Sequence, residues 1–306
     1  RHCPKCQGHQ KEQWIRAREA ELLPVPYFHV VFTLPQELNR LCLYMPKPLY
    51  NILFKVAWQV IHDFGNNPKF LGARSGMIAV LHTRGQNLSL HPHLHCIVPG
   101  GGLTPSGRWK PVKHRGKYLF PVKAMSKVFR ARFVSQLRKE PNLEMLSGFY
   151  NSLFKKPWVV YCKRPFLGPE QVIEYLGRYT HKIAISNHRI QDVGNGSVTF
   201  SMKDYRHGGK RSSMCLPDAE FIRRFALHIL PKGFVRIRHY GMLSSYHKRQ
   251  NLAELKKTLD PVRLKEKPPL LHNICPKCRQ GHLITITTFT ARGPPKYWID
   301  QLHTPQ

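Results

Sequence analysis

The sequence predicts an α+β protein whose core is an antiparallel, ferredoxin-like sheet with flanking helices. The prediction rests on strand patterns, on the helical patterns between them, and on their order along the chain. The predicted strands are residues 27–34, 76–83, 89–98 and 158–162, and the predicted helices are 36–64, 121–139 and 172–182. The order βαββ followed by a βα unit suits a ferredoxin-like sheet, with the last helix beside the middle strands.

The local sequence supports each predicted element of the core. The strand 27–34 is apolar and ends at Pro35, and the helix 36–64 is interrupted around Pro46-Lys47-Pro48. Residues 76–83 and 89–98 read as a hairpin, and 158–162 as a buried strand. The helix 121–139 is amphipathic, with basic side chains on a face that is either solvated or in contact with DNA. Its inward residues are Val128, Phe129, Phe133, Val134 and Leu137, and its outward ones are Lys127, Arg130, Arg132, Arg138 and Lys139.

The C-terminal half contains further predicted elements, and basic residues are spread over the whole chain. Strands at 183–185 and 197–202 flank a turn at Gly194-Asn195-Gly196, and a Gly-rich basic loop follows at 204–211. A helix at 218–229, a strand at 234–240 with one basic face, and a basic helix at 244–266 complete it. The sequence therefore divides into an N-terminal segment (1–22), an α+β core (23–210), a basic extension (211–266) and a C-terminal tail (267–306).

The composition indicates a polyanionic partner. The 306 residues include 49 Lys and Arg against 17 Asp and Glu, for a net charge of +32. Such an excess works against the compact state by self-repulsion, which disfavours an enzyme of neutral substrates and favours a nucleic-acid partner. Apolar runs near 18 residues and a signal peptide are not evident, so no membrane partner is expected. We expect a cytoplasmic protein, and a homo-oligomer is left open.

Histidines alternate in the segment His91-Pro92-His93-Leu94-His95-Cys96. The period of two places His91, His93 and His95 on one face of a strand, and Leu94 and Cys96 on the core side. Neutral imidazoles on one face can bind one divalent ion. A solvated, histidine-rich edge strand is the alternative.

Tyrosines recur at helical spacing downstream of the histidines. Pro169 and Glu170 favour a helix start, and Tyr175 and Tyr179 then share one helical face, with Lys182 one turn further on. Core packing or a stacking surface is the alternative. Beside a metal, however, a phenol can become a nucleophile toward a phosphodiester.

The two motifs together carry a family resemblance. His93-Leu94-His95 and Tyr175-x3-Tyr179, within HPHLHCIVPGGG and YLGRYTHKIAISN, resemble the HUH endonuclease superfamily and, within it, the rolling-circle transposases of the insertion-sequence-91 family. The resemblance covers most of the chain, from the first cysteine pair to about residue 250. It implies a bacterial, nucleoid-associated protein. Residues 1–22 would then be a partial zinc-binding module, 23–210 the nuclease core, 211–266 a DNA-binding extension, and 267–306 a tail with a second cysteine pair. The resemblance also implies that a tyrosine attacks one DNA strand and forms a 5′-phosphotyrosine link. The free 3′-hydroxyl then serves in strand transfer.

The resemblance also suggests the site. His93 and His95 would bind a divalent Mg or Mn ion, with His82 as third ligand by its upstream distance, and Gln86 or His91 as the next candidates. Tyr175 or Tyr179 would attack, and Lys182 would lower the phenol pKa, neutralise the phosphate or clamp the backbone. The partners would be single-stranded DNA at the transposon ends and at the target. A replication initiator or relaxase with the same chemistry, and a non-enzymatic zinc-containing DNA-binding protein, are the alternative functions.

Two Cys-Pro-Lys-Cys pairs have the spacing of zinc knuckles: Cys3 with Cys6, and Cys275 with Cys278. Each supplies half of a tetrahedral structural zinc site. The two pairs could meet as one site, or the second could recruit His272 or His282, and the resembled family has an N-terminal zinc module. The candidate DNA contacts are basic side chains of the C-terminal half: Arg178, Arg206, Lys210, Arg211, Arg236 and Arg238.

Overall fold

The computed structural model describes residues 22–113, 118–141, 143, 145–166, 172, 184–204, 208–247, 255, 259, 278 and 280. The chain forms two compact units, residues 1–262 and 263–306. The description below concerns the first unit. The predicted domain boundaries stay predictions.

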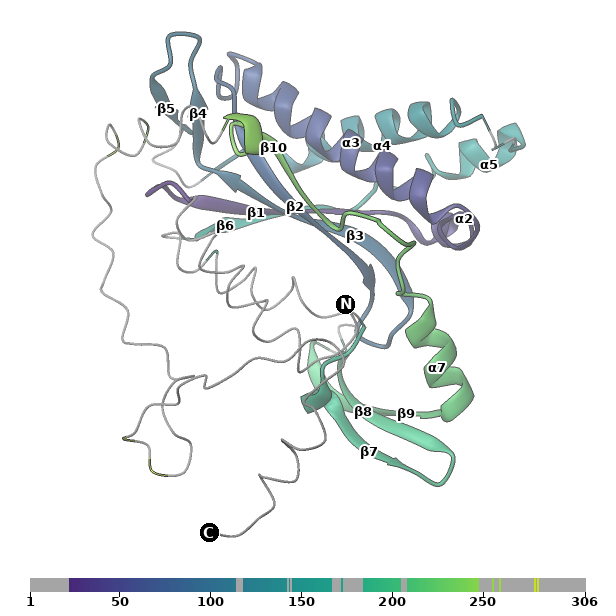
Figure 1. Cartoon of the computed structure of the whole chain (residues 1–306). Coiled ribbons are helices and arrows are strands. Elements are labelled where there is room, and N and C mark those ends of the chain that lie inside the picture. The colour runs from purple at the N-terminus through teal and green to yellow at the C-terminus, as the bar shows by residue number, and fades with distance from the viewer. Residues whose placement is uncertain are drawn as a thin grey trace. The chain divides into compact units, whose positions relative to one another are not determined.

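The central sheet is antiparallel and has the strand order β10-β2-β3-β1-β6 (Figure 1). Its strands are β1 (Tyr27–Thr33), β2 (Gly76–Arg84), β3 (Leu90–Pro99), β6 (Val160–Phe166) and β10 (Ile237–Gly241). Helices lie between β1 and β2 and between β3 and β6, so the order β2-β3-β1-β6 is that of a ferredoxin-like sheet. The predicted fold class is confirmed. The fifth strand, β10, comes from the segment predicted as a C-terminal extension.

Helices cover one face of this sheet (Figure 1). They are the short η1 (Gln36–Leu38), α2 (Asn39–Tyr44), α3 (Pro46–Asn66), α4 (Val122–Leu137) and α5 (Ser147–Ser152). The predicted break in the first helical segment falls at Met45, whose backbone leaves the helical region (φ −130°, ψ 55°). The residue before a proline is driven out of that region, and Pro46 then starts α3.

Aromatic rings join α4 to the sheet. The Phe129 ring centre lies 5.0 Å from that of Phe32 on β1 and 5.4 Å from that of Trp158. Phe133 also contacts Trp158, at 5.3 Å. Each such buried side chain stabilises the fold by about 1.5–3 kcal/mol. The predicted inward face of α4 is confirmed, with Val128 only half-buried.

The opposite face of the sheet is partly covered by a second apolar cluster. The sheet contributes Tyr27, Ile78, Val80 and Ile97, all buried. Segments from other parts of the chain pack on them with Leu22, Leu23, Val25, Leu103, Val172, Met242, Leu243 and Leu255. This face is therefore closed at one end of the strands.

The edge strand β6 differs from the prediction of a fully buried strand. Trp158 and Val160 are buried, whereas Val159 and Tyr161 are 61% and 53% exposed. The cause is its place at the end of the sheet order, where only the side facing the helices is covered. The side chains alternate accordingly.

A separate three-stranded sheet consists of β7 (Ile190–Gly194), β8 (Ser197–Asp204) and β9 (Lys210–Pro217), followed by α7 (Asp218–Ala226). The predicted turn is confirmed, with Asn195 and Gly196 at φ 50° and 70°. The predicted strand at 183–185 is wrong at Ala184 and Ile185, which lie outside the strands. The partner of β8 is instead β7, because a two-residue turn pairs Gly194 directly with Ser197.

The predicted loop at 204–211 is wrong at its ends, because Asp204 ends β8 and Lys210 and Arg211 begin β9. These ends pair as Asp204 with Lys210 in the β8–β9 ladder. Gly208 and Gly209 have φ of 71° and 75°, which a turn between two strands can use and most other residues cannot.

Three side chains from this region hold the turn between β2 and β3. Arg189 Nη2 donates to the Gln86 carbonyl (2.6 Å), and Arg224 Nη1 to the Asn87 carbonyl (3.1 Å). His228 Nε2 lies 3.0 Å from the Leu88 carbonyl, the third in the row. Leu88 itself has a φ of 61° and is fully buried with residues of the small sheet. The tight turn is thereby fixed from outside the central sheet.

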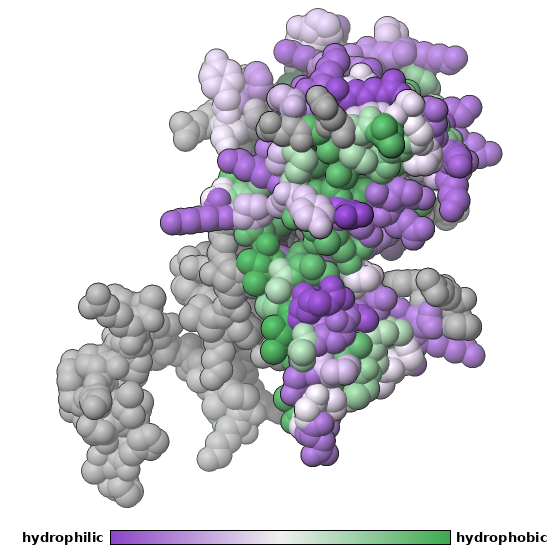
Figure 2. All heavy atoms as spheres, turned by 90° about the vertical axis from the view of Figure 1, so that its right-hand side faces the viewer, coloured by the Kyte–Doolittle hydropathy of each residue, from purple (hydrophilic) through white to green (hydrophobic). Residues whose placement is uncertain are grey.

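A small hairpin of β4 (Gly101–Leu103) and β5 (Trp109–Pro111) follows β3. Within the described residues, no helix is long and apolar enough to cross a membrane. On the side seen in Figure 2, hydrophilic side chains cover most of the surface, and hydrophobic ones reach it in the middle of the view.

Candidate metal centre and nucleic-acid face

The β2–β3 hairpin brings three histidines to one face of the central sheet. His82 on β2 pairs directly with His93 on β3, and Val80 pairs with His95. Because side chains alternate along a strand, His82, His93 and His95 share the face that the helices do not cover. Leu94 and Cys96 lie on the other face and are fully buried in the main core, as predicted.

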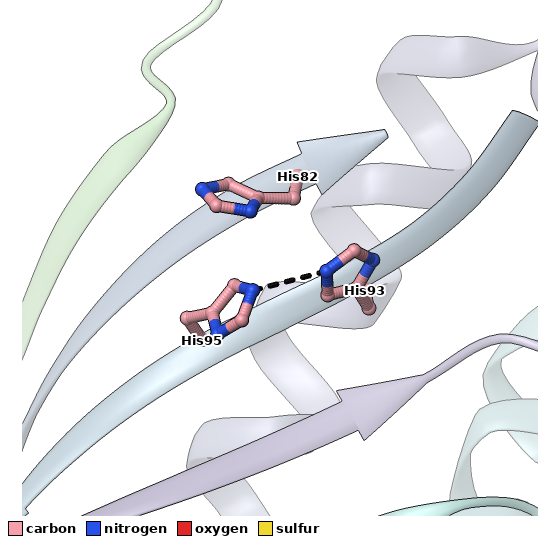
Figure 3. A group of neighbouring side chains, drawn as sticks. All are labelled: His82, His93 and His95. Atoms are coloured by element: carbon pink, nitrogen blue, oxygen red, sulfur yellow. Dashed lines mark hydrogen bonds between the residues drawn. The ribbon is translucent and has the colours of Figure 1, made fainter. Parts of the chain in front are cut away.

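The three rings converge on one point (Figure 3). One nitrogen from each ring lies within 4.8 Å of the others. The Nε2 atoms of His93 and His95 are 3.0 Å apart, and the ring centres of His82 and His95 are 4.3 Å apart. Ligand nitrogens bind zinc-like ions at about 2.0–2.1 Å, so small ring rotations suffice for a shared ion.

The second nitrogens of two rings have their own partners. His93 Nδ1 lies 2.6 Å from the backbone carbonyl of His91, which can only accept, so Nδ1 carries the proton and Nε2 offers a lone pair. His95 Nδ1 lies 2.8 Å from Nε2 of His29 on β1. Such outer contacts orient metal-binding histidines. His29 was missed in the sequence because it sits singly within an apolar strand.

Burial keeps the cluster neutral. Loss of solvent lowers the pKa of His93 to about 4, against an opposing hydrogen bond to the His91 carbonyl. Burial also lowers the pKa of His82 and His95 well below the ordinary 6.5, and the neighbouring histidines and Arg84 act in the same direction. Neutral imidazole is the form that binds metals.

The donor set fits a divalent ion. It consists of three imidazoles, and the five strands of the central sheet contain no Asp or Glu. Imidazole ligands suit Zn, Co, Ni and Fe, whereas Mg prefers oxygen ligands. Of the other two candidates for third ligand, His91 is exposed and is not part of the group. Gln86 lies in the turn between β2 and β3, where its backbone carbonyl accepts from Arg189.

Two arginines flank the histidines on the side of β10. A hollow beside His82 is lined by Thr83, Arg84, His228 and Arg236, with Leu81 and Leu230. The Arg236 carbonyl accepts from the Leu81 amide, which holds this residue against β2. Arg84 and Arg236 are close enough for both charges to lower the pKa of His82, although burial is the larger cause. This rim of the site is therefore cationic.

The other predicted DNA contacts have different surroundings. Lys210 and Arg211 are exposed at the start of β9. Arg238 is half-buried against α3, where Nη2 donates to Asn51 Oδ1 (2.6 Å) and the guanidinium lies 4.2 Å from the centre of the Phe54 ring. Its charge serves the packing of the helical layer, so we leave it out of the DNA-contacting set. Arg178 and Arg206 lie outside the described residues.

Of the predicted tyrosine helix, residues 172–182, the structure describes only Val172. Tyr175, Tyr179 and Lys182 lie outside the described residues, as do Cys3, Cys6 and Cys275. Cys278 is exposed. Val172, however, is fully buried in the second apolar cluster, with Ile78, Val80 and Ile97. These strand residues share the face that carries the histidines.

Comparison with known proteins assigns the chain to a family. A family described as "Putative transposase" matches residues 76–251, which is more than half of the chain and includes the whole histidine hairpin. A second family, described as "Transposase zinc-binding domain", matches residues 1–34. The chain belongs to the insertion-sequence-91 family of transposases. The second match includes Cys3 and Cys6.

Two curated relatives of this transposase are similar over most of its length. "Putative transposase y4qJ" of Sinorhizobium fredii is 41% identical over 330 residues, covering 97% of this chain and 82% of the relative. "Transposase for insertion sequence element IS801" of Pseudomonas savastanoi pv. phaseolicola is 30% identical over 257 residues, covering 80% and 61%. A solved structure of TrwC complexed with a 27-mer DNA covers 75% of this chain and 71% of its own, at 11% identity and a TM-score of 0.28.

Proposed function

We propose that this transposase nicks and rejoins single-stranded DNA by tyrosine attack, in rolling-circle-like transposition, with a metal ion held by His82, His93 and His95. The observation that carries the proposal is the convergence of three neutral imidazoles on the sheet face opposite α3 and α4, beside a cationic rim. An ion bound there supplies a Lewis acid for a phosphate oxygen and charge stabilisation in the transition state.

Chain connectivity supports the tyrosines as the nucleophiles. Val172 packs on the face of the sheet that bears the histidines. Three residues of chain span at most about 11 Å, so Tyr175 follows Val172 closely, and Tyr179 comes four residues later. The chain is therefore long enough for either phenol to reach the metal centre; Tyr175 and Tyr179 themselves lie outside the described residues.

The bond changes balance without an external energy source. The phenol oxygen of Tyr175 or Tyr179 attacks the phosphorus of a phosphodiester, and its proton leaves to a base. The bond from phosphorus to the 3′-oxygen breaks, and that oxygen takes up a proton to become a free 3′-hydroxyl. The 5′-phosphate stays on the tyrosine, so a later attack by a 3′-hydroxyl reverses the exchange and joins strands. Two tyrosines allow alternating cleavages.

Basic residues place the substrate. Lys182 neutralises the attacked phosphate or lowers the pKa of the attacking phenol, and Arg84 and Arg236 bind phosphates at the edge of β2. Lys210 and Arg211, with Arg178 and Arg206, extend the contacts along the strand. Phosphate neutralisation of this kind makes binding depend strongly on salt, in keeping with the net charge of +32.

Structural zinc is a separate part of the proposal. Cys3 and Cys6 lie within the segment that matches the zinc-binding family, and Cys275 with Cys278 repeats the spacing. Thiolates select Zn, whereas the histidine centre has no sulfur ligand. The two kinds of metal site are therefore chemically distinct.

A nicking assay tests the proposal. The full chain is incubated with single-stranded DNA from an end of its own element, with Mn²⁺ or Co²⁺. We expect cleavage that EDTA stops, that His95→Ala abolishes, and that the double variant Tyr175→Phe, Tyr179→Phe abolishes while it still binds metal. Tyr44→Phe, at an exposed tyrosine of the helical layer, is the matched control. Undiminished cleavage by the double variant would rule out these nucleophiles.

A further inference from the structure

Tyr161 lies in the same row of the central sheet as the metal centre. Val80, His95, Val31 and Tyr161 follow one another across four neighbouring strands. Neighbouring strands are about 4.8 Å apart, so the Tyr161 and His95 backbones are separated by roughly 10 Å. Val31, which lies between them in this row, is half-buried.

The Tyr161 side chain faces the histidine side. Its neighbours Val160 and Cys162 pair with Phe32 and Val30, which are buried in the core against the helices. Alternation then turns Tyr161 to the opposite face, where it is 53% exposed. A single exposed aromatic is ordinary on a protein surface. This one, however, shares a face and a row with a metal-binding cluster.

A cation accompanies the ring. Lys163, two residues on along β6, is exposed and shares the face of Tyr161. It pairs across the sheet with His29, and its charge contributes, after burial, to the lowered pKa of that histidine. The described strands of the sheet carry no acidic residue that would repel a phosphate.

We propose that Tyr161 and Lys163 form a nucleotide subsite, in which a base of the single-stranded DNA stacks on the Tyr161 ring and the adjoining phosphate contacts Lys163. Aromatic platforms beside cations are how single strands are bound without base-specific hydrogen bonds. The subsite rests on the proposed function for its place in the reaction. With this subsite, the bound DNA runs across the sheet from the metal centre toward β6, away from Arg84.

Binding measurements on the full chain test this subsite. Fluorescein-labelled oligothymidylate is titrated in EDTA, so that nicking does not interfere. Loss of one stacked base weakens binding between about 5-fold and about 150-fold; we expect this for Tyr161→Ala and Tyr161→Leu, while Tyr161→Phe stays near wild type. Tyr44→Ala, at a tyrosine of the helical layer that is 73% exposed, should not change the affinity. Lys163→Gln should reduce the slope of log affinity against log salt by about 0.7.

Crosslinking identifies the platform directly. With bromouracil in the oligonucleotide, illumination should attach a base to Tyr161, and Lys163→Gln should still crosslink. Wild-type affinity of Tyr161→Ala, with crosslinks elsewhere, would overturn the subsite even if Tyr175 and Tyr179 prove to be the nucleophiles. Loss of nicking in Tyr161→Phe with binding intact would also overturn it, because the hydroxyl and not the ring would then matter. Weakened binding in Tyr161→Ala, together with nicking by the Tyr175, Tyr179 double variant, would support the subsite and refute only the nucleophiles.

Discussion

His29 on β1 and His95 on β3 are joined ring to ring, with 2.8 Å between His29 Nε2 and His95 Nδ1. The two rings are nearly parallel, at 7°, and His29 is buried. A histidine thus takes the place of the carboxylate or carbonyl that usually orients a ligand histidine. The contact links the metal centre to the strand beside β6.

Removal of His29 should weaken metal binding without removing a ligand. We expect His29→Phe to bind Co²⁺ or Mn²⁺ about 10–100-fold more weakly, because the His95 ring loses its orienting partner. His29→Gln, whose amide can still hydrogen-bond, should recover part of the loss. Isothermal titration of the full chain measures both. His91→Ala, at an exposed neighbour outside the cluster, is the control, and an equal loss there would contradict a specific role.

The imidazole donor set should select among metals. We expect Co²⁺, Ni²⁺ and Zn²⁺ to bind the His82–His93–His95 centre more tightly than Mg²⁺, because imidazole ligands suit these ions and the centre has no carboxylate. The difference between wild type and His82→Ala in competition titrations isolates this centre from the cysteine sites. Tight Mg²⁺ binding that His82→Ala abolishes would mean that oxygen ligands complete the site.

The buried histidines make stability depend on pH. Burial lowers the pKa of His93, His29 and His228 from 6.5 to about 4. Between these values the unfolded chain binds protons that the folded chain does not. The free energy of unfolding should therefore be highest above about pH 6.5 and fall as the pH drops toward 4. Urea titrations in EDTA at several pH values measure this.

His228→Gln provides the comparison for that pH dependence. The amide can still donate to the Leu88 carbonyl, but it does not titrate. Between pH 6.5 and 4, the unfolding free energy of the His228→Gln variant should fall less than that of wild type. An unchanged decline would show that His228 does not contribute to it.

The turn between β2 and β3 should depend on Arg224. This side chain is 24% exposed and donates to the Asn87 carbonyl, and a hydrogen bond of a charged group is worth about 1.5–3 kcal/mol. Arg224→Ala should lower the unfolding free energy by that amount and weaken metal binding, since the turn sets the spacing of His82 and His93. Arg223→Ala is the matched control. Arg223 also forms an ion pair with Glu220, but its side chain is 61% exposed and has no described hydrogen bond to the turn. Equal effects of the two variants would contradict the role of the turn.

Local patterns predicted the core of the site. Alternation placed His93 and His95 on one face and Leu94 and Cys96 on the other, and the hairpin was evident in the sequence. The third position, His82, was suggested by family resemblance, and the pairing of His82 with His93 brings it into the cluster. A strand pattern does not contain that register, because it depends on the turn between the strands.

Long-range placement was beyond the sequence. The apolar pattern of 158–162 does not tell an edge strand from a central one, so the exposure of Tyr161 was missed. Arg238 reads as a surface cation, but the sheet order turns it toward α3. His29, alone in an apolar strand, acquires its role only by lying beside His95. In each case the neighbouring strand, and not the local sequence, decides the side chain's surroundings.

Mass spectrometry of the covalent peptide–DNA adduct tests the central claim most directly. The full chain is trapped on a single-stranded oligonucleotide from its element end, digested, and the modified residue is identified. The account predicts a 5′-phosphotyrosine at Tyr175 or Tyr179, absent in His95→Ala. An adduct on any other residue, or cleavage with no covalent link, would contradict it.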